Sequence, residues 1–367
     1  MKLVNVCGAR PNFMKVAPLM RAFAARPGSA VCLVHTGQHY DAAMSQAFFD
    51  DLGLPRPDIN LEVGSASHAR QTALIMQRFE PVVQRERPDA VLVVGDVNST
   101  IACGLVAAKL GVPVLHVEAG LRSFDRTMPE EINRVLTDAL SDLLFVTEPA
   151  GVANLEREGI AREKIHLVGN VMIDTLLACR ELAARSDVLQ RFGLAAGQYG
   201  VLTLHRPAAV DDAGVLGRIC EALVEIQRTV PLVFPVHPRT RANLERTGLR
   251  VRLEHAPGVR LTDPLGYLDF LKLLSSAAVV LTDSGGIQEE TTVLGVPCLT
   301  LRENTERPIT VEQGTNQLVG LDPARILAGF QRVREGRREP RVPELWDGRA
   351  AERIADIVVR WHQSRET

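Results

Sequence analysis

Residues 278–290, Ala-Val-Val-Leu-Thr-Asp-Ser-Gly-Gly-Ile-Gln-Glu-Glu, decide the fold of this 367-residue chain. The apolar run 279–281 predicts a strand buried on both faces, and Ser284-Gly285-Gly286 leads from it directly into a helical segment. Glycine lets the backbone approach a phosphate closely, and the first amides of a helix can donate to its oxygens. A plain tight turn is the alternative. The serine, the glycines and the paired glutamates favour a nucleotide site, with Glu290 accepting from the two ribose hydroxyls.

The same strand and helix alternation runs through the whole chain. Short apolar runs predict strands at residues 2–7, 30–35, 90–94, 112–117, 143–146, 164–168, 200–204, 232–235, 259–261, 279–281 and 296–299. Helical periodicity lies between them, at residues 12–25, 71–86, 99–110, 130–140 and 213–228. This pattern predicts an α/β protein with doubly wound parallel sheets.

The predicted strands fall into two groups, which indicates two Rossmann-like domains. Residues 172–192 form a helical stretch without a strand, and the turn-rich residues 193–200 follow. We therefore expect one domain over residues 1–172 and a second over residues 173–349. Ligands of open α/β sheets bind beyond the carboxyl ends of the strands. Two such sheets facing each other would converge on one cleft, so the residues after each strand are the candidate site.

Composition excludes several classes of function. A formal charge of −2 gives no basis for binding nucleic acid. The chain has no apolar run long enough to span a bilayer, no signal peptide and six scattered cysteines without a CxxC pair, so we expect a cytoplasmic protein with no membrane partner. The sequence lacks GxxxxGK[ST], GxGxxG, HExxH and DxD motifs. We expect no metal and no cofactor.

Two basic residues follow the first predicted strand. Arg10 and Lys15 stand at the start of the next helix, where helix amides and two cations would together bind an anion. Two solvated side chains on an ordinary helix are the alternative.

Three carboxylates follow strands or begin a helix in the first half of the chain. Asp96 follows residues 90–94, where it is either a functional group or part of a helix cap. Glu118 closes residues 112–117, and it needs a partner or a cleft because burying it unpaired would cost several kcal/mol. Thr127 and Glu130 fit a capping box. Glu130 and Arg134, one helical turn apart, are expected to face the same cleft as Asp96.

Two histidines end strands of the second half. His205 follows residues 201–204, and His237 follows residues 233–236. A single histidine is more often structural than catalytic, but two at equivalent strand ends favour a function.

The motifs that carry the candidate residues resemble those of one known family. They are Gly8-Ala-Arg10-Pro with Lys15, Thr36-Gly-Gln-His39, Gly95-Asp96, His116-Val-Glu-Ala-Gly-Leu-Arg122, Pro129-Glu-Glu with Asn133-Arg134, Gly169-Asn170, His205-Arg206, Pro235-Val-His237, Asp283-Ser-Gly-Gly-Ile-Gln-Glu-Glu290, Thr305-Glu-Arg-Pro308 and Asp347-Gly-Arg-Ala-Ala-Glu-Arg-Ile354. Nearly end to end, the chain resembles the non-hydrolysing UDP-N-acetylglucosamine 2-epimerases.

That resemblance implies a GT-B type fold, with a final helix at 350–367 completing the first domain, and usually a homodimer. It implies reversible conversion of UDP-N-acetylglucosamine to UDP-N-acetylmannosamine through 2-acetamidoglucal. In this family the carboxylates would move protons at the sugar, and His205 would assist the departing phosphate. The remaining residues would bind the substrate. The implied catalytic residues are Asp96, Glu118, Glu130 and His205, and the implied binding residues are Arg10, Lys15, Arg134, His237, Phe270, Ser284, Gly285, Gly286, Glu290 and Arg307.

Other functions remain open at this point. A GT-B glycosyltransferase would share the fold and the UDP site, a hydrolysing epimerase would release the free sugar, and a UDP-sugar sensor would bind without turnover. Departures such as Asn12 and Tyr40-Asp41 leave room for a modified hexosamine, for example a UDP-diacetamido sugar, and make activation by a second substrate molecule doubtful.

Overall fold

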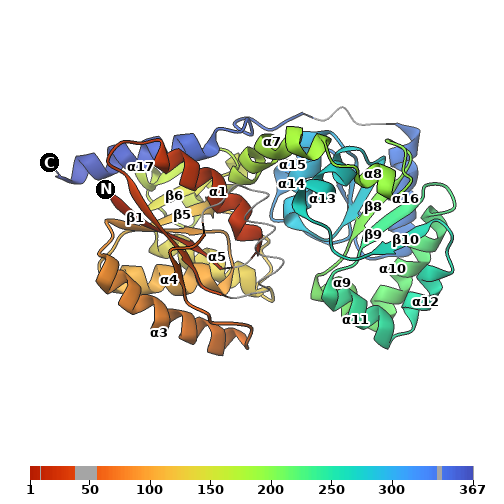
Figure 1. Ribbon diagram of the computed structural model, residues 1–367, viewed down its shortest axis with the longest axis horizontal. Helices are drawn as coiled ribbons and strands as arrows, with labels where there is room; N and C mark the ends of the chain where they lie inside the picture. The colour runs from red at the N-terminus through yellow and green to blue at the C-terminus, as the bar shows by residue number, and fades with distance from the viewer. Residues whose placement is uncertain (9, 38–55, 337–340, 367) are drawn as a thin grey trace. The chain divides into compact units, whose positions relative to one another are not determined.

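The computed structural model describes residues 1–8, 10–37, 56–336 and 341–366. The chain forms two compact α/β units, and each is described by itself (Figure 1). Unit 1 consists of Met1–Ala178 and Glu344–Thr367, and unit 2 consists of Cys179–Pro343. The sequence placed its domain boundary after residue 172, and the observed division falls six residues later, inside a helix.

Unit 1 is built on a seven-stranded parallel sheet with the order β3-β2-β1-β4-β5-β6-β7. Its strands are β1 (Lys2–Cys7), β2 (Ala30–His35), β3 (Ile59–Asn60), β4 (Ala90–Val94), β5 (Val114–Ala119), β6 (Leu143–Val146) and β7 (Ile165–Leu167). Its helices are α1 (Arg10–Ala24), α3 (His68–Glu86), α4 (Asn98–Lys109), α5 (Pro129–Leu140), α6 (Pro149–Arg157), the start of α7 (Val171–Ala184) and α17 (Ala350–Glu366), with the 3-10 turn η1 (Arg162–Lys164) before β7.

Unit 2 repeats the design with a six-stranded parallel sheet in the order β10-β9-β8-β11-β12-β13. Its strands are β8 (Gly200–Thr203), β9 (Leu232–Pro235), β10 (Val259–Thr262), β11 (Val279–Thr282), β12 (Cys298–Thr300) and β13 (Asn316–Leu318). Its helices are α8 (Val188–Arg191), α9 (Pro207–Val210), α10 (Ala213–Ile226), α11 (Pro238–Arg246), α12 (Leu249–Glu254), α13 (Tyr267–Ser275), α14 (Gly285–Leu294), α15 (Pro308–Glu312) and α16 (Pro323–Glu335). Within the described ranges, no helix combines the length and the apolar character needed to cross a bilayer.

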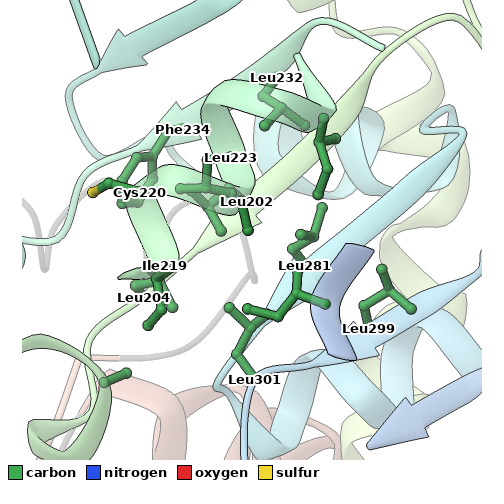
Figure 2. Close-up of a cluster of buried hydrophobic side chains, with 14 of the residues drawn as sticks. Leu202, Leu204, Ile219, Cys220, Leu223, Leu232, Phe234, Leu281, Leu299 and Leu301 are labelled. Atoms are coloured by element: carbon green, nitrogen blue, oxygen red, sulfur yellow. The ribbon is translucent and has the colours of Figure 1, made fainter. Parts of the chain in front are cut away.

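Alternate residues of each central strand enter different cores, which explains the unbroken apolar runs. In β8, Leu202 joins the cluster under α10 and α16, whereas Val201 joins the cluster under α13 and α14. Leu281 and Val280 of β11 divide in the same way. Figure 2 shows the first of these clusters, with α10 side chains packed on the strands. Strands covered on both faces need apolar residues at every position.

The sequence predicted the fold class correctly but misplaced or missed some elements. The short edge strands β3 and β13 were missed, because two or three residues carry no periodicity signal. The strand expected at 112–117 lies two residues later, as β5. The predicted capping box was wrong. Helix α5 begins at Pro129 with Met128 as its N-cap, and the Thr127 hydroxyl instead donates to Asp125 at 2.6 Å.

The C-terminal segment is fixed to unit 1 by buried contacts. Trp346 is 1% exposed, and its indole Nε1 donates to the Thr147 carbonyl at 2.9 Å. Asp174 accepts hydrogen bonds from the first amides of α17, those of Ala350 at 3.1 Å and Ala351 at 2.7 Å. A carboxylate at a helix N-terminus satisfies amides that have no partner inside the helix. These contacts make α17 part of unit 1 although it is distant in sequence.

Removing the Trp346 side chain tests this attachment. The Trp346→Ala variant should lose about 3–5 kcal/mol of folding free energy, because a large buried ring leaves a cavity and an unpaired carbonyl. The midpoint of urea unfolding, followed by circular dichroism, measures the loss. The matched control is Trp361→Ala, since Trp361 is only half-buried. Equal losses in the two variants would contradict the anchoring role of Trp346.

Candidate functional site

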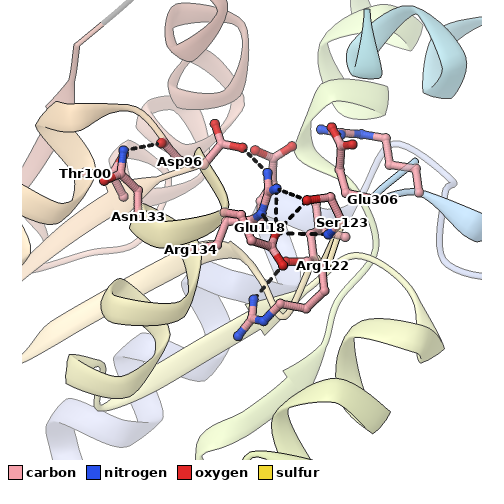
Figure 3. Close-up of polar contacts among 12 residues, drawn as sticks. Asp96, Thr100, Glu118, Arg122, Ser123, Asn133, Arg134 and Glu306 are labelled. Carbon is pink, nitrogen blue, oxygen red and sulfur yellow. Dashed lines mark hydrogen bonds and ion pairs between the residues drawn. The ribbon is translucent and has the colours of Figure 1, made fainter. Parts of the chain in front are cut away.

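The carboxyl edge of the first sheet gathers charged side chains beside three neighbouring strands. Figure 3 shows two of them, Asp96 and Glu118. The strand order of unit 1 changes direction between β1 and β4, and open α/β sheets bind ligands at such a point. Lys15 lies on α1 after β1, Asp96 follows β4, and Glu118 lies in the adjacent β5.

The Glu118 carboxylate is buried and has a buried cationic partner. Lys15 Nζ donates to Glu118 Oε2, and both side chains are almost wholly shielded from solvent. Gly95 packs against the pair, because a Cβ there would lie 3.1 Å from Glu118 Oε2 and 3.2 Å from Lys15 Nζ. Its φ of +71° also favours glycine. The partner that the sequence required for Glu118 is therefore Lys15, and losing either group would leave an uncompensated buried charge.

The backbone at Glu118 adopts a conformation that is unusual for glutamate. Its φ is +69°, and the pairing of β5 with β6 shifts register between Val117 and Ala119. Glu118 thus lies in a bulge inside the strand. The sequence had placed it after the strand. Left-handed non-glycine residues cost of order 1–3 kcal/mol and concentrate at functional sites, where bulges aim side chains.

Asp96 is held by two consecutive residues of α5. Arg134 Nη1 donates to Asp96 Oδ2 at 2.5 Å, and Asn133 Nδ2 donates to the Asp96 carbonyl at 2.8 Å. Asp96 does not cap α4, whose N-cap is Val97 without a side-chain bond. The Asp96 side chain remains 28% exposed, so a ligand can reach it.

Glu131 supports this arrangement and was not singled out from the sequence. Its Oε2 accepts from Arg134 Nη2 at 2.7 Å and from the Ser123 amide at 2.9 Å, and its Oε1 accepts from the Phe124 amide at 2.9 Å. Burial alone would raise the pKa of Glu131, but the amides and the guanidinium outweigh it and lower that pKa. Glu131 therefore stays ionised and orients Arg134.

Glu130 differs from its neighbour. It lies in the first turn of α5 and is half-buried, and in the described part of the chain its carboxylate has no hydrogen bond or ion pair. Without the predicted capping role, this carboxylate is available to a ligand.

A fully buried histidine connects the loops that follow β4 and β5. His116 Nε2 lies 2.9 Å from the Gly95 carbonyl oxygen, and Nδ1 lies 2.6 Å from Asp138 Oδ1. Asp138 Oδ2 accepts from the Gly120 amide at 3.0 Å and pairs with Arg122 Nη2 at 2.7 Å. This network was not predicted. It holds the backbone at Gly95, just before Asp96, and at Gly120, two residues after Glu118.

The second sheet has its own switch point between β8 and β11, where Ser284-Gly285-Gly286 begins α14. Ser284 is the N-cap but makes no side-chain capping bond, and it remains partly exposed. Gly285 is required by packing, because a Cβ there would lie 2.4 Å from Arg307 Nη1. The turn therefore places helix amides and a guanidinium together, the groups that bind phosphate.

Arg307 belongs to a buried charge network. Its Nε donates to Glu289 at 2.6 Å and its Nη1 to Glu306 at 2.5 Å, while Arg302 Nη2 donates to Glu306 at 2.7 Å. Burial would raise the pKa of Glu306, but the surrounding arginines hold it well below its usual value. Glu289 and Glu306 were not predicted, although both lie within the motifs that carry the resemblance.

Glu290 is buried one turn into α14. Tyr267 Oη donates to Glu290 Oε1 at 3.2 Å. Loss of hydration raises the pKa of Glu290 to about 7, and the tyrosine only partly offsets this. Any additional hydrogen-bond donor would stabilise the ionised form of this buried carboxylate.

Two imidazole rings lie close together at the ends of β8 and β9, tilted by 45°. The ring centroids of His205 and His237 are 5.7 Å apart. His205 Nδ1 lies 2.9 Å from Oδ1 of the buried Asp283, and His237 Nδ1 accepts from the Arg239 amide at 3.2 Å. The sequence predicted the two histidines but assigned no role to Asp283.

Phe270 and Arg10 are the remaining predicted residues. Phe270 is half-buried against the cluster under α13 and α14. Arg10 is the first residue of α1, but its side chain lies outside the described residues, as do Gln38, His39 and Tyr40.

Comparison with known proteins agrees with this geometry. A family model described as UDP-N-acetylglucosamine 2-epimerase matches residues 21–359. The chain belongs to this family. The UDP-N-acetylglucosamine 2-epimerase of Methanocaldococcus jannaschii is 42% identical over 98% of this chain and 99% of its own length. A crystal structure of the M. jannaschii protein, in complex with UDP-GlcNAc and UDP, has a TM-score of 0.93 at 42% identity and covers 98% of this chain and 100% of that one.

A second kind of epimerase is equally similar. The UDP-2,3-diacetamido-2,3-dideoxy-D-glucuronate 2-epimerase of Pseudomonas aeruginosa is 42% identical over 98% of this chain and 100% of its own length. The epimerase family therefore contains relatives at the same identity that differ in the sugar named. The two parallel α/β units have the architecture of the GT-B class, which these epimerases share.

The raised pKa of Glu290 predicts a pH-dependent stability. Its value in the fold, about 7, exceeds the ordinary 4.5, so the folded protein binds more protons than the unfolded chain between these values. The raised pKa of Glu290 contributes fully to the free energy of unfolding at low pH, and this contribution is lost as the pH rises through 7. Relative to the wild type, Glu290→Gln should therefore gain melting temperature between about pH 5 and pH 8. The exposed Glu335→Gln on α16 is the control, and a flat difference for Glu290→Gln would contradict the assignment.

Proposed function

We propose that this chain is an isomerase that reversibly inverts C2 of UDP-N-acetylglucosamine, giving UDP-N-acetylmannosamine. The observation that carries the proposal is the set of three carboxylates at strand and helix ends, in a chain 42% identical over nearly its full length to a named epimerase. The route is elimination of UDP to 2-acetamidoglucal, followed by re-addition with the opposite C2 configuration.

The C2 proton sets the chemical problem, because no carbonyl flanks it. In the elimination, the C1–O bond breaks, its electron pair stays on the β-phosphate oxygen, and a base takes the C2 proton to form the C1=C2 double bond. In the return step, an acid delivers a proton to the opposite face of C2 while the phosphate oxygen attacks C1. General acids and bases typically contribute about 10²–10⁴-fold each, and electrostatic stabilisation of the leaving group often accelerates such a reaction more.

Unit 1 supplies the proton-transfer groups in this proposal. Asp96 is accessible and held by Arg134, Glu118 is aimed by a bulge and paired with Lys15, and Glu130 is ligand-accessible at a helix start. Inversion needs a base on one face of the sugar and an acid on the other, which one carboxylate cannot provide. The arginine and the lysine also supply positive charge for the phosphates.

Unit 2 binds UDP in this proposal. Ser284, Gly285 and Gly286 offer helix amides and a hydroxyl to the diphosphate, and Arg307 lies against the glycines. Glu290 accepts from the ribose hydroxyls. The remaining assignments are His205 at the departing phosphate, His237 and Arg10 beside the diphosphate, and Phe270 near the uracil.

Proton NMR in D₂O tests the reaction. We expect deuterium at C2 of UDP-N-acetylglucosamine together with new UDP-N-acetylmannosamine signals, because elimination passes the C2 proton to solvent. Asp96→Asn should abolish turnover yet keep UDP affinity within a few-fold, whereas Asp356→Asn, which breaks a surface pair with Arg26, should change neither. Sugar transfer to an acceptor without C2 exchange would favour the glycosyltransferase, and release of the free sugar would favour a hydrolysing epimerase.

A modified hexosamine is the second candidate substrate. The relative from P. aeruginosa supports it, since its identity to this chain equals that of the UDP-N-acetylglucosamine epimerase of M. jannaschii. The same NMR assay, run with a UDP-diacetamido sugar beside UDP-N-acetylglucosamine, compares kcat/KM for the two. A higher value for the diacetamido sugar would reassign the substrate and leave the reaction type unchanged.

We also propose that the chain forms a homodimer through α5. This helix buries its charged side and exposes an apolar one, on which Ile132 and Leu136 lie one turn apart. Phe124, in the loop before the helix, is exposed as well. An exposed apolar face of this kind is typical of a contact surface. A self-complementary contact of the α5 faces of two copies would remove it from water.

Leu136→Glu tests this surface. Leu136 is 49% exposed, and a charge there would have to be desolvated in the dimer, so the variant should be monomeric in sedimentation experiments. Leu182→Glu is the matched control, because Leu182 on α7 is 45% exposed but lies outside this face. A monomeric wild type, or a dimeric Leu136→Glu variant, would exclude the proposed interface.

The state of the thiols supports a reducing compartment such as the cytoplasm. No disulfide joins the six cysteines, which all lie in the described part of the chain, and five of them are buried. Burial raises the pKa of thiols such as Cys220, to about 12, which makes them unreactive.

A further inference from the structure

Asp283 makes three contacts with one short segment of chain. Its Oδ2 accepts the backbone amides of His205 and Arg206, both at 2.8 Å. Its Oδ1 lies 2.9 Å from His205 Nδ1, an ion-pair contact, and accepts no hydrogen bond from the described residues. The carboxylate is fully buried at the end of β11, whereas 40% of the His205 side chain is exposed. A buried carboxylate thus holds the backbone of an accessible histidine by hydrogen bonds and lies in ion-pair contact with its ring.

The contacts give the two neighbouring histidines opposite tautomers. A carboxylate cannot donate, so its negative charge 2.9 Å from His205 Nδ1 favours a hydrogen on that nitrogen, and the neutral ring then has its lone pair on Nε2. His237 Nδ1 accepts from the Arg239 amide, so the neutral His237 ring carries its hydrogen on Nε2. Neutral His237 can donate from Nε2 to a phosphate oxygen. Neutral His205 cannot.

We propose that Asp283 is a positioning residue that holds His205 in the Nδ1–H tautomer, so that a pyrophosphate group binds beside His205 only with uptake of one proton at Nε2. The proton comes from solvent and makes His205 an imidazolium that donates to the phosphate. Asp283 stabilises that cation through Nδ1. The inference rests on the proposed function in assigning UDP to this site, and deepens it by naming the group that controls His205.

The charges around His205 are compatible with this behaviour. Neighbouring elements present His237 from the end of β9 and Asp283 from the end of β11, and the adjacent Arg206 has its Nη2 3.6 Å from Glu306. Glu306 is also paired with Arg302 and Arg307, so three arginines share its negative charge. Asp283 is the carboxylate in contact with the ring.

In the reaction, this coupling supplies a positive charge where negative charge develops. When the C1–O bond breaks, its electron pair goes to the β-phosphate oxygen, and an imidazolium beside it stabilises the UDP that leaves. When UDP departs from the enzyme, the proton returns to solvent, which resets the neutral ring. Asp283 acts through His205 and does not touch the substrate.

The tautomer can be read without any ligand. In ¹⁵N NMR spectra of the ring nitrogens, free wild-type protein above neutral pH should show His205 as the Nδ1–H form. In Asp283→Asn the amide oxygen can accept the backbone amides while its NH₂ faces Nδ1, so His205 should change to the Nε2–H form. An Nε2–H ring in the wild type, or the same tautomer in both proteins, would overturn the proposal whatever reaction the enzyme catalyses.

Proton uptake is measured by titrating UDP calorimetrically in buffers of different ionisation enthalpy. At about pH 8 imidazole is ordinarily neutral, so wild-type binding should take up about one proton. Glu290, with a pKa of about 7, is already largely ionised there. Uptake should vanish in Asp283→Asn and in His205→Gln, and should persist in His237→Gln, the matched control. His205→Gln keeps the test valid should Asp283→Asn fail to fold.

Turnover separates this proposal from the proposed function. Asp283→Asn should lower kcat roughly 10²-fold with KM changed only a few-fold, because a positioned proton donor contributes about 10²–10⁴-fold. Failure of C2 exchange in the wild type would remove the epimerase assignment but leave the tautomer and proton-uptake results standing. Equal buffer dependence in wild type and Asp283→Asn would remove the role of Asp283 alone.

Discussion

A carboxylate that becomes buried on folding needs a cation or hydrogen-bond donors as partners, and this requirement determines how the loops of both units are held. Glu118 has Lys15, Asp138 has Arg122 and His116, and Asp283 has His205 with two backbone amides. Each pair forms where a parallel strand ends, because there a side chain can be enclosed by the sheet and still meet a group from the next loop. An unpaired buried charge would cost several kcal/mol, so these contacts fix the loops in which they lie.

The pairs make the two units chemically different although their topologies match. In unit 1 the strand ends present carboxylates, of which Asp96 and Glu130 remain accessible. In unit 2 the equivalent places present imidazoles, helix amides and Arg307. One unit thus presents accessible carboxylates, and the other presents groups of the kind that bind anions. The fold is shared with enzymes of other activities, and the difference lies in the side chains at the strand ends.

Several residues outside the proposed chemistry hold the candidate site residues in place. Glu131 orients Arg134, which in turn orients Asp96. His116 holds the Gly95 carbonyl, and Asp283 holds His205. Supporting groups of this kind keep reacting groups within the narrow geometry that catalysis needs. Substitutions among them should therefore affect turnover as well as stability.

The amino-acid sequence by itself determined the fold class, most strand positions and the motif set from which the family follows. It did so because strands buried on both faces need unbroken apolar runs, and because glycine turns before helices leave a local signature. Only the tertiary structure decided which charges pair. Lys15 and Glu118 are 103 positions apart, and Asp283 and His205 are 78 apart. The capping box failed for a local reason instead, because the Thr127 hydroxyl donates to Asp125, two residues before it. A pair distant in sequence exists only once the parallel sheet brings its strand ends together.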